Sequence, residues 1–253
     1  MAADQSDSIK SHGGFGETVK VLIHALLLAL VVRTFLYQPF NIPSGSMKPT
    51  LLIGDYLFVS KFSYGYSAAS FPFAFKFFEG RVWDGAPERG DVAVFKLPRD
   101  GQTDYIKRVI GLPGDRIQMR DGVLYINSEP VKRERVDDFV SDDPGSSGAQ
   151  VAQYRETLPN GVTYLTLDLV PDGVSDNTRV YEVPPGHYFM MGDNRDNSTD
   201  SRVLTAVGFV PFENFVGRAE IIFFSIDESA HFWEFWTWPV TVRWSRLLDL
   251  VGS

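Results

Sequence analysis

Ser46 and Lys107 are the two side chains in this sequence whose types and settings suit nucleophilic catalysis. Ser46 lies in Ser-Gly-Ser, where the glycine lets a substrate backbone approach the hydroxyl closely. Lys107 lies in the strand-like stretch Tyr-Ile-Lys-Arg, and apolar walls around a lysine lower its pKa so that it can accept a proton. That pKa must fall from about 10.4 to near 7 for the neutral amine to prevail at neutral pH. Taken singly, such residues are more often a loop hydroxyl and a surface charge.

A third polar segment, residues 192–202, reads Gly-Asp-Asn-Arg-Asp-Asn-Ser-Thr-Asp-Ser-Arg. Asp196, Ser198 and Asp200 alternate along it, and their oxygens could bind calcium. The segment lacks the glycine at position six and the glutamate at position twelve of an EF-hand loop. We therefore expect no metal site and no cofactor.

A histidine-based mechanism is an alternative for Ser46. With four histidines in the chain, His187 and Asp193 are the only suitably placed partners for a Ser/His/Asp arrangement. His187 lies in the strand-like run His-Tyr-Phe-Met-Met, which favours a structural role.

The composition excludes several classes of function. A formal net charge of -8 offers no basic face to nucleic acid, so no nucleic-acid partner is expected. The absence of cysteine excludes thiol catalysis, disulfide bonds and Cys-ligated zinc.

The elements that position these residues are expected to be mainly β. Fifteen prolines and 22 glycines along 253 residues favour many short strands over long helices. We expect an antiparallel β catalytic domain made of residues 38–120 and 186–231. Residues 121–185 change in character and are expected to form a small inserted β subdomain.

The N-terminal region contains one stretch able to cross a bilayer, which predicts a membrane anchor at residues 19–37. Eighteen helical residues reach roughly 27 Å, near the hydrocarbon thickness. No small-x-small cleavage site follows, so the anchor is expected to stay uncleaved. Lys20, His24 and Arg33 leave open a buried or interfacial helix instead. Residues 1–18 are polar and are expected to form a flexible cytoplasmic tail.

The C-terminal segment, residues 232–253, is rich in aromatic side chains. Aromatic residues favour the membrane interface, so this segment is expected either to contact lipid or to pack in the core.

In this order, residues 42–51, 104–115 and 192–202 resemble the motifs of bacterial type I signal peptidases, the leader peptidases, a family of serine/lysine proteases. The resemblance covers roughly residues 40–112 and 184–202. It implies a mostly β catalytic domain beyond a membrane anchor, and no cofactor. Many family members carry a second N-terminal span and a larger insert, whereas one span and about 65 inserted residues are expected here.

The resemblance also implies roles for individual residues. Ser46 is the nucleophile, Lys107 the general base, and Ser198 orients the lysine. The backbone N–H of Ser46 and the hydroxyl of Ser44 form the oxyanion hole. The shallow substrate pockets are lined by Phe40, Ile42, Leu51, Tyr105, Ile106 and Met190.

The activity implied is cleavage after an A-x-A-like motif, which removes the signal peptides of exported preproteins. The implied location is the bacterial inner membrane, with a single span in the bilayer and the catalytic domain on the periplasmic side. A non-enzymatic alternative is a membrane-tethered β module whose Ser and Lys only bind peptides. Acylation of Ser46 by a reactive lactam would distinguish the enzyme from the binding module.

Overall fold

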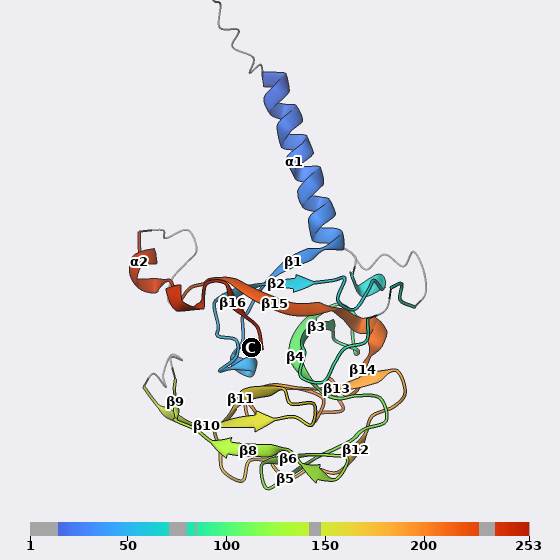
Figure 1. Ribbon diagram of the computed structural model, residues 1–253, viewed down its shortest axis with the longest axis vertical. Helices are drawn as coiled ribbons and strands as arrows, with labels where there is room; N and C mark the ends of the chain where they lie inside the picture. The colour runs from blue at the N-terminus through green and yellow to red at the C-terminus, as the bar shows by residue number, and fades with distance from the viewer. Residues whose placement is uncertain (1–14, 71–79, 84, 142–147, 228–235, 253) are drawn as a thin grey trace, which may run out of the picture.

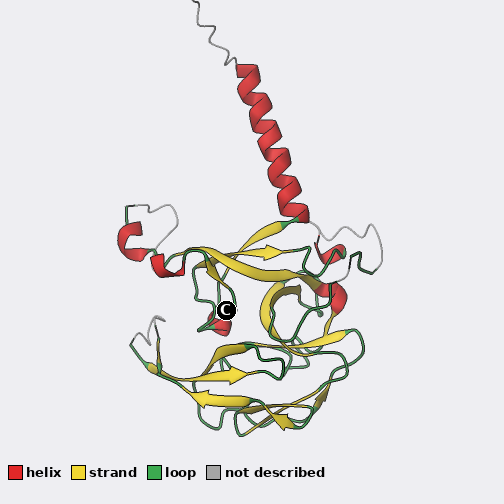
Figure 2. Ribbon diagram, viewed as in Figure 1, coloured by secondary structure: helices red, strands yellow, loops and turns green. Residues whose placement is uncertain are grey.

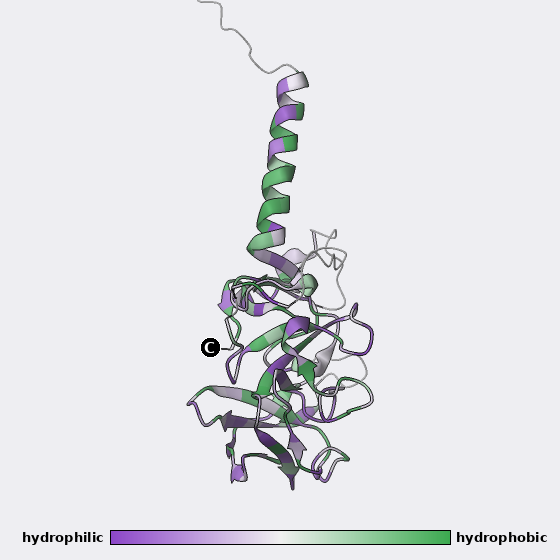
Figure 3. Cartoon of the chain, turned by 90° about the vertical axis from the view of Figure 1, so that its right-hand side faces the viewer, coloured by the Kyte–Doolittle hydropathy of each residue, from purple (hydrophilic) through white to green (hydrophobic). Residues whose placement is uncertain are grey.

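The computed structural model describes residues 15–70, 80–83, 85–141, 148–227 and 236–252, and shows a long helix standing on a β body (Figures 1 and 2). The helix α1 (Phe15–Phe35) has no buried residue, and Figure 3 shows that its hydrophobic colouring covers most of its length. Within the described ranges it is the one helix long and apolar enough to cross a membrane.

The helix α1 begins four residues before the expected anchor, so residues 15–18 are helical. Phe15 extends the apolar run, and Glu17 in the first turn interacts favourably with the positive end of the helix dipole. The helix ends shortly before Pro39, because the residue preceding a proline is driven away from helical dihedrals. The remainder of the expected tail, residues 1–14, lies outside the described residues.

The larger sheet is antiparallel and has the strand order β1-β2-β15-β3-β4-β13-β14, with β16 paired to β15. Its strands are β1 (Tyr37–Asn41), β2 (Asp55–Ser60), β3 (Val92–Lys96), β4 (Asp104–Gly111), β13 (His187–Met191), β14 (Val210–Pro211), β15 (Phe215–Ser225) and β16 (Asp249–Leu250). The long strand β15 lies between β2 and β3, so a late part of the chain joins two early hairpins. The expectation of a mainly β fold is confirmed.

Two smaller sheets lie in residues 116–182, the part of the chain that we call the inserted subdomain. Its strands are β5 (Arg116–Arg120), β6 (Val123–Ile126), β7 (Glu129–Pro130), β8 (Lys132–Arg135), β9 (Phe139–Val140), β10 (Gln150–Thr157), β11 (Thr163–Asp168) and β12 (Tyr181–Glu182). The strand β5 begins five residues before the expected start at residue 121. It belongs to this subdomain because Ile117 and Met119 are buried in the same core as Leu124 and Ile126.

The strand β13 joins the two β layers through its alternating side chains. Phe189 and Met191 are buried in the core of the inserted subdomain. Tyr188 and Met190 are buried on the other side, in a core shared with the larger sheet. Successive strand residues point to opposite faces, so this one strand fixes the subdomain against the larger sheet.

Short helices complete the fold: η1 (Gly45–Met47), η2 (Ala68–Ser70), η4 (Phe212–Asn214), α2 (Trp238–Thr241) and η5 (Trp244–Arg246). In the C-terminal segment, residues 232–235 lie outside the described residues. The side chains of Trp236 and Trp244 are 65% and 59% exposed. The helix α2 lies at the end of the β body from which α1 projects (Figure 1).

Candidate active site

Ser46 and Lys107 come from parts of the fold that are not adjacent in the strand order of the larger sheet. Ser46 lies in η1, which follows β1 after three residues, and Lys107 lies in the first half of β4. The Nζ atom of Lys107 is 2.7 Å from the Oγ atom of Ser46. Both residues are buried, with exposed fractions of 4% and 9%. A neutral amine at this distance is placed to accept the serine proton.

The surroundings of Lys107 favour its neutral form. Burial lowers the pKa of Lys107 from 10.5 to about 8, and Asp200 and Asp193 oppose this shift only in part. The amine also donates a hydrogen bond to the carbonyl oxygen of Ile106 at 2.9 Å. A substantial fraction of Lys107 is therefore uncharged near pH 8.

The loop that carries Ser46 is held from behind by residues 192–194. The backbone N–H of Asn194 donates to the Ser46 carbonyl at 3.1 Å, and the Asn194 side-chain amide donates to the Gly45 carbonyl at 3.0 Å. Gly192 permits this close contact. A Cβ atom there would lie 2.5 Å from the Ser46 carbonyl oxygen and 2.3 Å from Ser198 Oγ.

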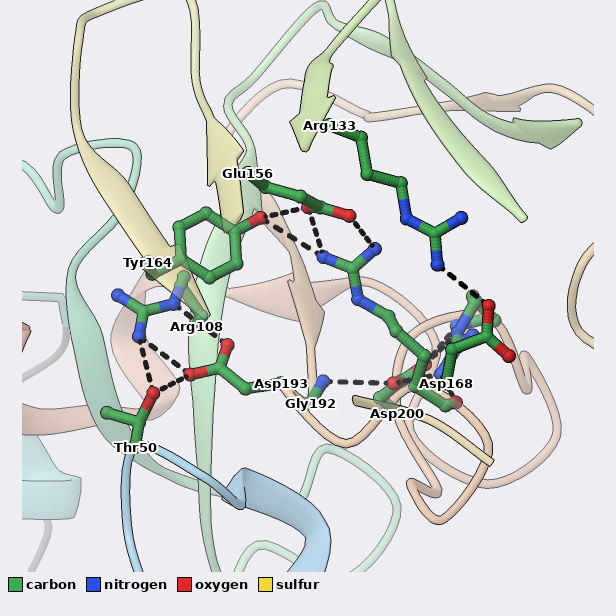
Figure 4. Close-up of polar contacts among 11 residues, drawn as sticks. Thr50, Arg108, Arg133, Glu156, Tyr164, Asp168, Gly192, Asp193 and Asp200 are labelled. Carbon is green, nitrogen blue, oxygen red and sulfur yellow. Dashed lines mark hydrogen bonds and ion pairs between the residues drawn. The ribbon is translucent and has the colours of Figure 1, made fainter. Parts of the chain in front are cut away.

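Two buried ion pairs fix this third segment. Arg108 donates two hydrogen bonds to Asp193, at 2.9 and 2.7 Å, and Thr50 donates a third at 2.5 Å (Figure 4). Asp200 accepts two hydrogen bonds from the Arg202 guanidinium, one from the Arg202 backbone N–H and one from the backbone N–H of Gly192. Burial alone would raise the pKa of Asp200, but the Arg202 guanidinium holds it below its usual range. Both aspartates thus hold the segment that supports the Ser46 loop.

A cavity of about 680 Å³ opens above the Ser46 and Lys107 pair. It is lined by all three motifs and includes eight of the ten predicted site residues: Phe40, Ile42, Ser44, Ser46, Tyr105, Ile106, Lys107 and Ser198. Leu51 and Met190 do not line it. Both are 0% exposed and lie in the hydrophobic cores behind the cavity.

Ser198 lies beside the pair without the expected contact to the lysine. Its Oγ atom is buried, and its polar interaction is with Asp200, where it helps to hold the pKa of that carboxyl below its usual range. The two hydrogen bonds of the Lys107 amine go to Ser46 and Ile106 instead. Ser198 therefore lies at the edge of the cavity without a hydrogen bond to Lys107.

The alternative partners for a Ser/His/Asp arrangement are placed elsewhere. The Nδ1 atom of His187 lies 2.9 Å from the carbonyl oxygen of Pro185, and His187 does not line the cavity. Both oxygens of Asp193 are engaged by Arg108. The geometry therefore favours Lys107 over His187 as the base for Ser46.

The third segment also differs from a calcium loop. One carboxylate oxygen of Asp196 accepts the backbone N–H groups of Leu169 and Val170, and Asp200 is paired with Arg202. Among the described residues no cluster of three or more His, Asp or Glu is suited to hold a metal ion.

Sequence reasoning missed the residues that support the site from the inserted subdomain. Glu156 and Tyr164 contact Arg195 of the third segment, and Tyr164 also lies against Arg108. The motif at residues 192–202 contains Arg195, but nothing in the motif identifies its partner Glu156, which lies 39 residues earlier in the chain. The one signal available in the sequence was Glu156, a glutamate within the expected strand 150–157.

Comparisons with known proteins identify the family of this chain. The family model described as signal peptidase, peptidase S26, matches residues 15–224. Signal peptidase I of Rickettsia typhi is 45% identical over 228 residues, which cover 87% of this chain and 84% of the relative. Signal peptidase I of Rickettsia conorii is 47% identical over 209 residues, covering 79% and 76%.

Among solved structures, a signal peptidase I from Enterococcus faecalis aligns with 53% of this chain and 96% of its own, at 29% identity and a TM-score of 0.31. The assignment of family rests on the family model and the relatives. The chain belongs to the signal peptidase family, peptidase S26.

Proposed function

We propose that this protein is a membrane-anchored endopeptidase that removes signal peptides from exported preproteins, with Ser46 as nucleophile and Lys107 as general base. The observation that carries the proposal is the 2.7 Å separation of Lys107 Nζ and Ser46 Oγ at the base of the cavity. The names of the relatives support the substrate class.

The reaction is acyl transfer in two halves. Ser46 Oγ attacks the scissile carbonyl carbon while Lys107 Nζ takes the hydroxyl proton. The tetrahedral oxyanion is stabilised by the Ser46 backbone N–H and the Ser44 hydroxyl, donors worth about 3 to 4 kcal/mol each. Its collapse breaks the C–N bond, and the Lys107 ammonium protonates the departing amine. Water, deprotonated by Lys107, then hydrolyses the ester and frees Ser46.

The substrate is proposed to bind as an added strand beside the catalytic pair. In β4, residues 104–107 pair with β3 on one side, whereas β13 pairs only with residues 108–111. The other edge of residues 104–107 borders the cavity, opposite β1. An extended peptide entering there forms main-chain hydrogen bonds, and its alternate side chains enter the pockets.

Cleavage of a synthetic leader peptide, with the cut site read by mass spectrometry, tests the function and its specificity. The peptide with Ala immediately before the cut should be hydrolysed at one bond. Phe at that position should reduce kcat/KM by about 100-fold or more, because we expect Ile42 and Ile106, which line the cavity, to form a shallow pocket that excludes an aromatic ring by steric clash. Phe one residue earlier is the matched control: it points away from these pockets in an extended peptide and should be tolerated. Equal cleavage of all three peptides would refute the pocket assignment.

The pH dependence should follow the neutral form of Lys107. Because its pKa is lowered to about 8, the fraction able to act as a base increases as pH rises through that value. We expect kcat/KM to rise about tenfold per pH unit below pH 8 and to level off above pH 9. The measurement is a rate profile from pH 6 to 10 on one peptide. A plateau already reached near pH 7 would point to a histidine base.

We also propose that α1 crosses the bacterial inner membrane once and leaves the β domain on the periplasmic side. Its length of 21 residues reaches about 32 Å, and its side chains are free of protein contacts that would bury them. The exposed Trp236 and Trp244 lie in the C-terminal segment near the same end and are proposed to reach the bilayer interface. The protein should retain its N-terminus and resist alkaline carbonate extraction; release into the soluble fraction would exclude the anchor.

A further inference from the structure

The inserted subdomain contacts the third segment directly through its backbone. The N–H of Leu167, in β11, donates to the Asp193 carbonyl at 2.9 Å, and the N–H of Arg195 donates to the Leu167 carbonyl at 3.0 Å. These bonds make a short parallel bridge between Leu167 and Asn194. The inserted subdomain therefore supports residues 193–195, which in turn hold the Ser46 loop.

Glu156 strengthens this contact with a buried ion pair to Arg195. The two guanidinium N–H groups donate to the two carboxylate oxygens at 2.8 and 2.5 Å, and both side chains are at most 4% exposed. Burial alone would lower the pKa of Arg195, but Glu156 raises it above its usual value, so the guanidinium stays charged. The Tyr164 hydroxyl adds a hydrogen bond to Glu156 at 2.8 Å.

Tyr164 links this ion pair to the brace on the other side of the third segment. Its ring centroid lies 4.2 Å from the guanidinium carbon of Arg108, which is itself paired with Asp193. Figure 4 shows one group of polar contacts that includes Glu156 and Tyr164 and a second group made by Arg108, Asp193 and Thr50, with the Tyr164 ring lying against Arg108 between them. The inserted subdomain thus holds the third segment at both Asp193 and Arg195.

The residue between these two attachment points is the one that holds the nucleophile. Asn194 donates to the Ser46 and Gly45 carbonyls, so a shift of residues 193–195 moves the loop that carries Ser46. A displacement of about 1 Å in a reacting group can cost two orders of magnitude in rate. Buried ion pairs add little net stability compared with apolar packing, so the pair is better explained by the geometry that it imposes.

We propose that Glu156 is a positioning residue for catalysis, which acts through Arg195 and Asn194 to hold Ser46 at the distance that Lys107 requires. This role rests on the proposed Ser/Lys peptidase activity. It differs from a purely structural role because it predicts a loss in kcat that does not follow stability.

The first test is Glu156→Gln, which keeps the side-chain volume and removes the charge. We expect kcat for leader-peptide cleavage to fall at least tenfold with KM within twofold of the unmutated protein, because Glu156 does not line the cavity. Glu134→Gln is the matched control: Glu134 lies on the neighbouring strand β8 in an exposed ion pair with Lys132, and its kcat should be unchanged. A kcat within twofold in Glu156→Gln would overturn the proposal.

A double variant, Glu156→Met with Arg195→Met, separates an effect on the position of Ser46 from an effect on the stability of the protein. Replacing both charges with apolar side chains should restore the Tm, whereas kcat should stay at least tenfold low. Recovery of kcat together with Tm would show a structural role alone.

If Glu156→Gln fails to fold, Tyr164→Phe is the deciding variant. It keeps the ring on Arg108, removes the hydrogen bond to Glu156, and should lower kcat about threefold. An unchanged kcat there would overturn the proposal.

All variants are assayed in the full chain, beside the unmutated protein and Ser46→Ala. Cleavage by the unmutated protein and its loss in Ser46→Ala establish the peptidase activity independently of Glu156. Failure of the unmutated protein to cleave would refute the proposed function itself, so the two failures are distinguishable.

Discussion

Lys107→Ala is expected to reduce kcat for leader-peptide cleavage by at least about 1,000-fold while the protein stays folded. The amine is the group placed 2.7 Å from Ser46 Oγ, and within the described residues no other side chain is hydrogen-bonded to that hydroxyl. Lys107→Arg should fail as completely, because a guanidinium stays protonated and cannot accept a proton. The measurement is a rate assay on one peptide, with thermal melts to verify folding.

Two further variants make this result specific to Lys107. Lys96→Ala removes a lysine that pairs with Asp104 at the rim of the site and should keep most of the activity. His187→Ala should keep most of it too, because the ring lies against Pro185 and outside the cavity. Activity that survived in Lys107→Ala but vanished in His187→Ala would overturn the serine/lysine mechanism.

Gly192→Ala is expected to lower kcat by about 100-fold or more without touching either reacting group. The added methyl would lie 2.5 Å from the Ser46 carbonyl oxygen and 2.3 Å from Ser198 Oγ. One neighbour is backbone, so the Ser46 loop must shift, and a shift of this size misplaces the nucleophile. Steady-state kinetics on the folded variant provide the measurement.

Gly101→Ala is the control for this substitution. It adds the same methyl group at a loop position where nothing lies within 4 Å, although its φ of 65° carries a modest strain in the folded state. Its kcat should equal that of the unmutated protein. Equal activity of both alanine variants would show that the loop has room to adapt and that close packing at Gly192 is unimportant.

Much of the fold could be predicted because its signals are local. The apolar run after residue 18 predicts a helix, and the scattered glycines and prolines predict short strands. The bounds were less accurate: α1 begins at Phe15 and β5 at Arg116. Helix ends depend on single capping and dipole contacts, and the membership of β5 depends on which core buries Ile117.

The candidate site was predictable where chemistry constrains the residue type. Ser46, Lys107 and Ser44 belong to motifs whose residues the structure places around one cavity. Leu51 and Met190 show the limit of assigning roles to residues from a family resemblance. Their residue types suit a pocket wall, yet both are completely buried, because burial is set by the layers that pack on each face of the sheet.

The sequence by itself determined the proposed reactive groups, the apolar helix and the β character of the chain, because these follow from residue type and short-range pattern. Only the tertiary structure decided which distant residues meet. Ser46 and Lys107 are 61 residues apart, and Glu156 and Arg195 are 39 apart. Their contacts depend on strand order and register, and an alternating pattern specifies which face of a strand is buried but not which strand becomes its neighbour.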